Sequence, residues 1–125
     1  MDTYGFTHKG YDRKTVNAIS SSPRALTADE SGQIFTNTGA SGPIVFNLPT
    51  ISDADDIGVY YPFAKLADQT ITINAAAGEY VGDSSASGSI SNSTAGQTYA
   101  PITLVSVSAS TWAILPGAVG SWTTT

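Results

Sequence analysis

The sequence predicts an all-β fold, an antiparallel β-sandwich or barrel of roughly 8–10 short strands with an extended N-terminal arm. Polar and apolar residues alternate with period two in several short runs, which is typical of half-buried strands. Serine and threonine number 32 while charged residues make up only 12% of the chain, so hydroxyl groups cover much of the surface. Threonine favours pleated strands, and no window shows a sustained apolar stripe at helical spacing.

Chain length and charge divide the sequence into two parts. At 125 residues the chain is long enough for one core, so we expect an arm over residues 1–23 and a single β domain over residues 24–125. Residues 1–24 carry a net charge of +2 and residues 25–125 carry −7, with Lys65 the only basic residue of the second part. An acidic body argues against a nucleic-acid partner, because binding there requires basic groups that neutralise phosphates.

The basic arm is the segment that we predict to bind a partner. Aromatic and basic side chains are enriched at protein interfaces, so we expect the arm to dock on an acidic surface of a neighbouring subunit or another protein. The alternative is a self-packed first strand, and residues 15–19 have strand character before the break at residues 20–23. The predicted interface residues are Tyr4, Phe6, His8, Tyr11, Arg13 and Lys14.

The segment over residues 26–49 is predicted to form a β-hairpin. Residues 33–37 and 44–48 both alternate polar and apolar side chains, and a glycine-rich turn with Pro43 separates them. Residues 57–66 are predicted to form a longer strand in which Pro62 marks an edge or a bulge. This strand is expected to pair with residues 69–74 as a second hairpin.

The remaining elements follow in order. Residues 78–82 are predicted to form a brief strand, and residues 83–96 an outward-facing loop in which Ile90 is the only large apolar residue. Residues 102–107 and 111–115 are predicted to be strands around a turn at residues 108–110.

Several short motifs follow one another in a fixed order: Leu26-Thr27-Ala28-Asp29, Ser31-Gly32, Phe35-Thr36-Asn37-Thr38-Gly39-Ala40, Phe46-Asn47-Leu48-Pro49, Ile71-Thr72-Ile73, Ala77-Gly78, Thr103-Leu104-Val105, Trp112 with Ile114, and Gly120-Ser121-Trp122-Thr123. This series resembles a small β domain common in bacteriophage virion proteins. The resemblance covers about residue 24 to the end of the chain. It implies a place in a tail fibre, a fibre tip or a capsid surface, commonly as a trimer.

Catalysis is not expected from this set of residues. The one histidine lies in the arm, cysteine is absent, and no serine stands in a Gly-x-Ser-x-Gly elbow. Adjacent carboxylates at Asp29 and Glu30 would point to opposite faces of a strand, and a turn at Ser31-Gly32 explains them equally well. The acidic residues Asp53, Asp55 and Asp56 are expected to form a solvated loop. The alternative is a calcium site, which agrees less well with their spacing. The prediction is a non-enzymatic protein without cofactor or metal.

Two functions remain open. The first is a capsid decoration (cement) protein, a homotrimer whose arm docks on the major capsid protein or another virion protein. The alternative is a tail-fibre or fibre-tip module that binds a host receptor glycan through residues 83–96. The chain has no heptads or repeats of a fibre shaft, which favours decoration. We expect the protein on the surface of the phage particle, and in the host cytoplasm during assembly. No membrane partner is expected, since no stretch approaches about 20 apolar residues.

Overall fold

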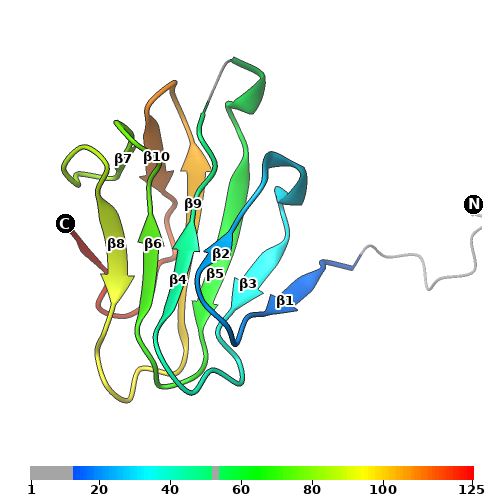
Figure 1. Cartoon of the computed structure of the whole chain (residues 1–125), viewed down its shortest axis with the longest axis vertical. Coiled ribbons are helices and arrows are strands. Elements are labelled where there is room, and N and C mark those ends of the chain that lie inside the picture. The colour runs from blue at the N-terminus through cyan, green and yellow to red at the C-terminus, as the bar shows by residue number, and fades with distance from the viewer. Residues whose placement is uncertain (1–12, 52–53) are drawn as a thin grey trace, which may run out of the picture.

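The computed structural model describes residues 13–51 and 54–125, which form two β-sheets packed face to face (Figure 1). The first sheet contains, in spatial order, β1 (Val16–Ala18), β3 (Ile34–Thr36), β5 (Tyr60–Lys65), β9 (Ala100–Ser106), β10 (Thr111–Ile114) and β7 (Tyr80–Val81). The second contains β11 (Thr123–Thr124), β8 (Ser89–Asn92), β6 (Ile71–Asn74), β4 (Ile44–Asn47) and β2 (Arg24–Ala25). Two short 3-10 helices, η1 (Ala28–Glu30) and η2 (Ala54–Asp56), complete the described elements.

The predicted all-β sandwich is confirmed, with eleven strands in the described part of the chain. The sheets are mixed, whereas the sequence predicted antiparallel ones. From β1 to β8 the chain alternates between the two sheets, so β1, β3 and β5 run parallel in one sheet and β2, β4 and β6 run parallel in the other. Each pair of successive strands is thus one turn of a coil wound around the core.

The predicted hairpin over residues 26–49 is wrong. The chain does turn between β3 and β4, where Gly39 has a φ of +83° that favours glycine. However, β3 pairs with β1 and β5, while β4 pairs with β2 and β6 in the opposite sheet. The alternation of side chains correctly indicated two strands with one buried face each, but it carries no information about their partners.

The second predicted hairpin is wrong for the same reason, because β5 and β6 lie in different sheets. The turn between them is held by Asn37, which is fully buried. Its side-chain oxygen accepts hydrogen bonds from the Leu66 and Ala67 N–H groups, both at 2.8 Å. Its amide nitrogen donates to the carbonyls of Ala67 and Gln69. A turn that crosses between sheets is therefore stabilised by one side chain from the preceding coil.

Pro62 was expected at an edge or a bulge, but β5 lies between β3 and β9. The ladder between β3 and β5 begins at Phe63, one residue after the proline. At Pro62 the strand is paired with Thr103 of β9 alone. The missing N–H group is tolerated because the ladder on the other side has not yet started.

The predicted loop over residues 83–96 contains a strand. Within it, β8 pairs with β6 and β11, and Ile90 is only 1% exposed. Its small neighbours permit close packing: a Cβ on Gly88 would lie 2.4 Å from the carbonyl oxygen of Thr125. Small residues here reflect a close approach of the C-terminal segment rather than an outward excursion.

The other predicted elements are confirmed. Residues 15–19 contain β1, residues 78–82 contain β7, and β9 and β10 form an antiparallel hairpin closed by a 3.0 Å bond from the Val107 N–H to the Thr111 carbonyl. Aromatic rings fill the centre of the sandwich, with centroids of neighbouring rings 5.2–6.3 Å apart. These rings belong to Phe35, Phe46, Tyr61, Phe63 and Trp112.

Candidate interaction surface

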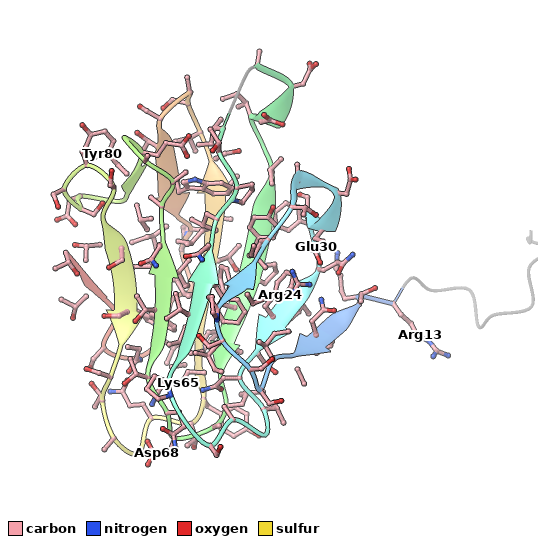
Figure 2. All side chains as sticks on the ribbon, viewed as in Figure 1. Arg13, Arg24, Glu30, Lys65, Asp68 and Tyr80 are labelled. Carbon is pink, nitrogen blue, oxygen red and sulfur yellow. The ribbon has the colours of Figure 1, made fainter. Side chains whose placement is uncertain are left out.

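Residues 1–12 of the predicted arm lie outside the described residues, whereas residues 13–23 are described and contain β1, a strand packed in the first sheet beside β3. Tyr4, Phe6, His8 and Tyr11 lie in the part of the chain that the structure does not describe. Arg13 and Lys14 are described and exposed, and the Arg13 side chain points away from the sandwich (Figure 2). They precede β1, which is the last strand of the first sheet on that side.

Next to β1, an ion pair closes one side of the sandwich. The Arg24 guanidinium donates to both carboxylate oxygens of Glu30, at 3.1 and 2.5 Å, and its Cζ lies 5.4 Å from the ring centroid of Phe35 (Figure 2). The hydrogen bond from Arg24 lowers the pKa of Glu30, and the same bond raises the pKa of Arg24. Arg24 is therefore neutralised within the body, which leaves Arg13 and Lys14 as the unpaired basic residues among residues 13–24.

Glu30 also closes the turn that contains η1. Its Oε1 accepts a 3.0 Å hydrogen bond from the Thr27 N–H, and the Tyr61 hydroxyl donates to the Thr27 carbonyl. Burial raises the pKa of Tyr61, so this hydroxyl keeps its proton. The neighbouring carboxylate of Asp29 is exposed. Glu30 is thus a structural group held by Arg24, and the two adjacent acids do not form a catalytic pair.

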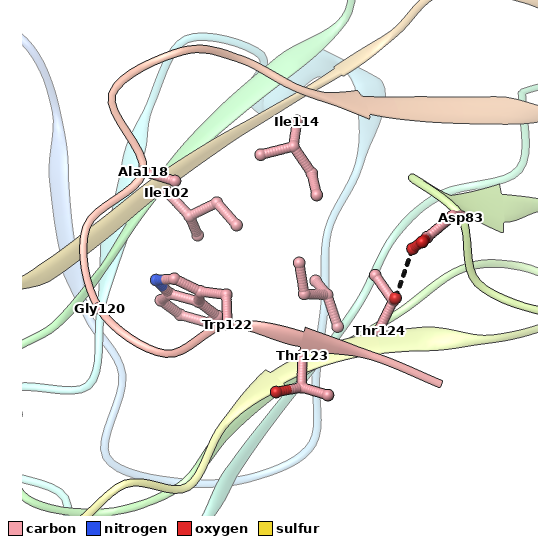
Figure 3. Close-up of a pocket in the computed structure, with 9 residues that line it drawn as sticks. Asp83, Ile102, Ile114, Ala118, Gly120, Trp122, Thr123 and Thr124 are labelled. Carbon is pink, nitrogen blue, oxygen red and sulfur yellow. Dashed lines mark hydrogen bonds between the residues drawn. The ribbon is translucent and has the colours of Figure 1, made fainter.

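The opposite side of the sandwich contains a hollow of about 430 Å³ between β10 and β11 (Figure 3). Its floor is aliphatic, formed by the buried side chains of Ile90 and Ile102. Asp83 lies at its rim, where its carboxylate accepts a hydrogen bond from the Thr124 hydroxyl. The lining residues are Asp83, Ile90, Ile102, Ile114, Ala118, Gly120, Trp122, Thr123 and Thr124.

Residues 115–122, here called the closing segment, connect β10 to β11 across this hollow. Trp122 donates its indole N–H to the Val119 carbonyl at 2.9 Å, and the Ser121 N–H donates to Oε1 of Gln97 at 2.8 Å. Gly120 has a φ of +95°, and a Cβ there would lie 2.7 Å from the same oxygen of Gln97. The hollow is therefore walled by a segment that one glutamine side chain and one glycine hold in place.

Large apolar side chains are exposed in and next to the hollow. Ile114 lines the hollow, Leu115 and Val119 belong to the closing segment, and Val119 is 53% exposed. Sequence reasoning missed this surface, although residues 113–119 form an apolar run without the polar alternation of a half-buried strand. A cluster of exposed apolar groups beside an apolar hollow is typical of a binding surface.

No metal or membrane feature is found in the described ranges. Residues 13–51 and 54–125 contain no cluster of three or more His, Cys, Asp or Glu side chains that could hold a metal ion. Of the acidic loop, Asp55 and Asp56 lie in η2, and Asp53 is outside the described residues. No helix in the described ranges is long and apolar enough to cross a membrane.

A comparison with protein-family models and with curated proteins finds no match for this chain.

Proposed function

We propose that the protein is a structural component of a bacteriophage virion, a capsid decoration protein whose N-terminal residues bind capsid subunits. The observation that carries the proposal is the separation of charge. Residues 25–125 contain eight acidic residues and one lysine, and that lysine is buried, whereas Arg13 and Lys14 are exposed beside the edge strand β1. A basic segment that leaves an acidic domain at its edge is suited to bind a neighbouring acidic surface.

The resemblance to phage virion domains supports the same proposal. Its motifs contain Phe35, Phe46 and Leu48, which are core residues of the sandwich. The resemblance therefore covers the β domain. We assign the role that is specific to this protein, binding to capsid subunits, to the residues that precede the domain. In this proposal Tyr4, Phe6 and Tyr11 are the buried anchors on the capsid, and Arg13 and Lys14 provide charge pairs.

A homotrimer is part of the proposal. The three arms of one trimer would bind three sites on the head at once, so a modest contact for each chain is enough for stable decoration. The rival receptor-binding role relied on residues 83–96 as an exposed loop. Because β8 lies inside this range with Ile90 buried, we do not extend the proposal to that role.

The test is binding to phage heads assembled without this protein. Deletion of residues 1–12 removes the aromatic residues of the arm and keeps β1 in the sheet. We expect the affinity for heads to fall by about tenfold or more, because the deletion removes the anchors. A matched control, Lys65→Met, removes a basic residue from the body instead and should leave binding unchanged in preparations that remain folded. Undiminished binding of the deletion variant would overturn the proposal.

A further inference from the structure

We infer that the outer edge of β1 binds an extended, acidic segment of the capsid subunit, which joins the first sheet as an added strand. This contact deepens the proposed function, on which it rests, because it names the kind of segment that the arm region recognises. The site is formed by described residues, the edge strand β1 (Val16–Ala18) and the two basic residues Arg13 and Lys14 that precede it. Addition of a strand to an exposed sheet edge is a common way in which proteins bind extended segments.

The backbone of β1 is paired on one edge only. The Ile34 N–H donates to the Thr15 carbonyl at 2.9 Å, and the Ile19 N–H donates at 2.8 Å to a carbonyl of β3. Because the backbone groups of successive strand residues point to opposite edges, the N–H and C=O groups of Val16 and Ala18 face away from β3. β1 is the last strand on this side of the sheet, so within the described ranges these groups have no strand beside them (Figure 1). Such a row of donors and acceptors is a template for one more strand.

The sheet ends at β7 and β2 are capped by the chain itself. At β7, the outward Val81 N–H donates to the Ser84 hydroxyl at 2.9 Å, and the Val81 carbonyl accepts from the Ser84 N–H at 3.0 Å. At β2, the outward carbonyl of Ala25 accepts a hydrogen bond from the Arg24 guanidinium. β1 has three residues, against two in each of the other end strands, and the described part of the chain places no such cap on it. Among the described sheet ends, β1 is thus the most suitable for an added strand.

The charge beside β1 indicates an acidic partner. Arg13 and Lys14 are exposed and directly precede the strand, so a segment that pairs with β1 passes next to two cations. Opposite charges on neighbouring strands stabilise a pair, whereas like charges destabilise it. A second copy is less suited, because residues 15–23 and 115–125, which contain its β1 and β11, include no aspartate or glutamate. Carboxylates that face the two cations therefore come from another protein, which in the proposed function is the capsid subunit.

The experiment removes one outward N–H group of β1 from the full chain and measures binding to phage heads assembled without this protein. Ala18→Pro removes a donor that faces away from β3, and an edge strand tolerates proline at such a position. Ala18→Val is the matched control, because it adds a side chain of similar size and keeps the N–H group. We expect the affinity for heads to fall about tenfold for Ala18→Pro and to stay within about twofold of wild type for Ala18→Val.

Two further measurements address the strand and the charge. Backbone hydrogen exchange over residues 15–19 should become slower when the protein is bound to heads, because an added strand takes up the outward N–H groups. Lys14→Glu should lower the affinity for heads about tenfold, since it places a carboxylate against the acidic segment, and Lys14→Arg should leave the affinity unchanged. Thermal unfolding confirms that each variant is folded, and Val16→Pro, at the first residue of the strand, replaces Ala18→Pro if that variant is not.

Wild-type affinity of the folded Ala18→Pro variant, or unchanged exchange over residues 15–19, overturns the added strand. Wild-type affinity of Lys14→Glu overturns the acidic character of the partner segment. If Ala18→Pro converts a multimeric protein to single chains in light scattering while Ala18→Val does not, the edge belongs to a second copy and the inference is likewise overturned. Failure of the proposed function is seen separately, as undiminished head binding after deletion of residues 1–12.

Discussion

The two sides of the sandwich are closed in different ways. Beside β1 and β2, Arg24 lies over Phe35 and is paired with Glu30, whose carboxylate also holds the Thr27 N–H. Beside β10 and β11, a strand of two residues and the closing segment surround a hollow of about 430 Å³, and apolar side chains remain exposed. The same two sheets thus end in a sealed side and an open side.

The two sides differ in which groups are paired or buried within the chain and which remain in contact with water. The sealed side pairs the charges of Arg24 and Glu30 within the chain, while Arg13 and Lys14 beside β1 stay exposed. The open side leaves apolar surface in contact with water, which costs free energy until another surface covers it. Loss of an aromatic ring on the sealed side should therefore cost more free energy of unfolding than loss of one on the open side.

The largest expected effect is on the sealed side. Phe35→Ala removes a fully buried ring that contacts Phe46, Tyr61 and Phe63, and it should lower the free energy of unfolding by about 3–5 kcal/mol. Trp122→Ala on the open side removes a half-buried ring and should cost only about 1–2 kcal/mol. Urea unfolding of both variants measures the difference. Equal losses would contradict the distinction between the two sides.

The closing segment provides the second comparison, at two glycines with positive φ. Gly120→Ala introduces a Cβ within 2.9 Å of the Ala100 Cβ and 2.7 Å from Oε1 of Gln97, whereas a Cβ at Gly117 meets nothing within 4 Å. We expect a loss of about 2–4 kcal/mol for Gly120→Ala and about 1–2 kcal/mol for Gly117→Ala, because only the first adds crowding to backbone strain. Thermal unfolding should rank the two, and a reversed order would show that the closing segment is not packed at Gly120.

Lys65 links the end of the core to the open side. It is only 1% exposed, and its Nζ donates to the carbonyls of Thr94 and Gln97 at 2.8 Å each, while Asp68 is 3.7 Å away (Figure 2). Lys65→Met should lower the free energy of unfolding by about 1–3 kcal/mol, since two carbonyls lose their donor. The ion pair is long and its Asp68 side chain is 54% exposed, so it contributes little and Asp68→Asn should cost about 0.5 kcal/mol or less. Equal costs in urea unfolding would mean that the ion pair, rather than the two carbonyls, holds Lys65.

The smallest effect concerns the ion pair of the sealed side. Because the pKa of Glu30 is lower in the folded protein than its ordinary value of 4.5, the pair stabilises the fold above that value. This contribution is lost as the pH falls through the folded pKa. Glu30→Gln should therefore cost about 0.5–1 kcal/mol at pH 7, discounted for partial exposure, and progressively less as the pH falls below 4.5. Unfolding of both proteins over a series of pH values measures this, and a difference that does not depend on pH would contradict the role of the charge.

Much of the strand content was predictable because it depends on local pattern. The alternation around Ile71 and Ile73 indicates a strand wherever its partners lie, and the turn at residues 108–110 joins two strands that are neighbours in sequence. The region of β8 was missed because it contains a single large apolar residue, Ile90, among small polar ones. Its burial depends on Gly88 and on the C-terminal residues that pass close to it.

The candidate surfaces likewise have some features that the sequence predicts and others that depend on the tertiary structure. The sequence alone indicates the basic character of Arg13 and Lys14 and the apolar run after β10, because charge and hydropathy belong to each residue. Strand partners, the burial of Lys65 and the hollow between β10 and β11 were decided by the tertiary structure. Period-two alternation specifies which face of a strand is buried, but the choice of sheet depends on how turns far apart in the sequence cross the core.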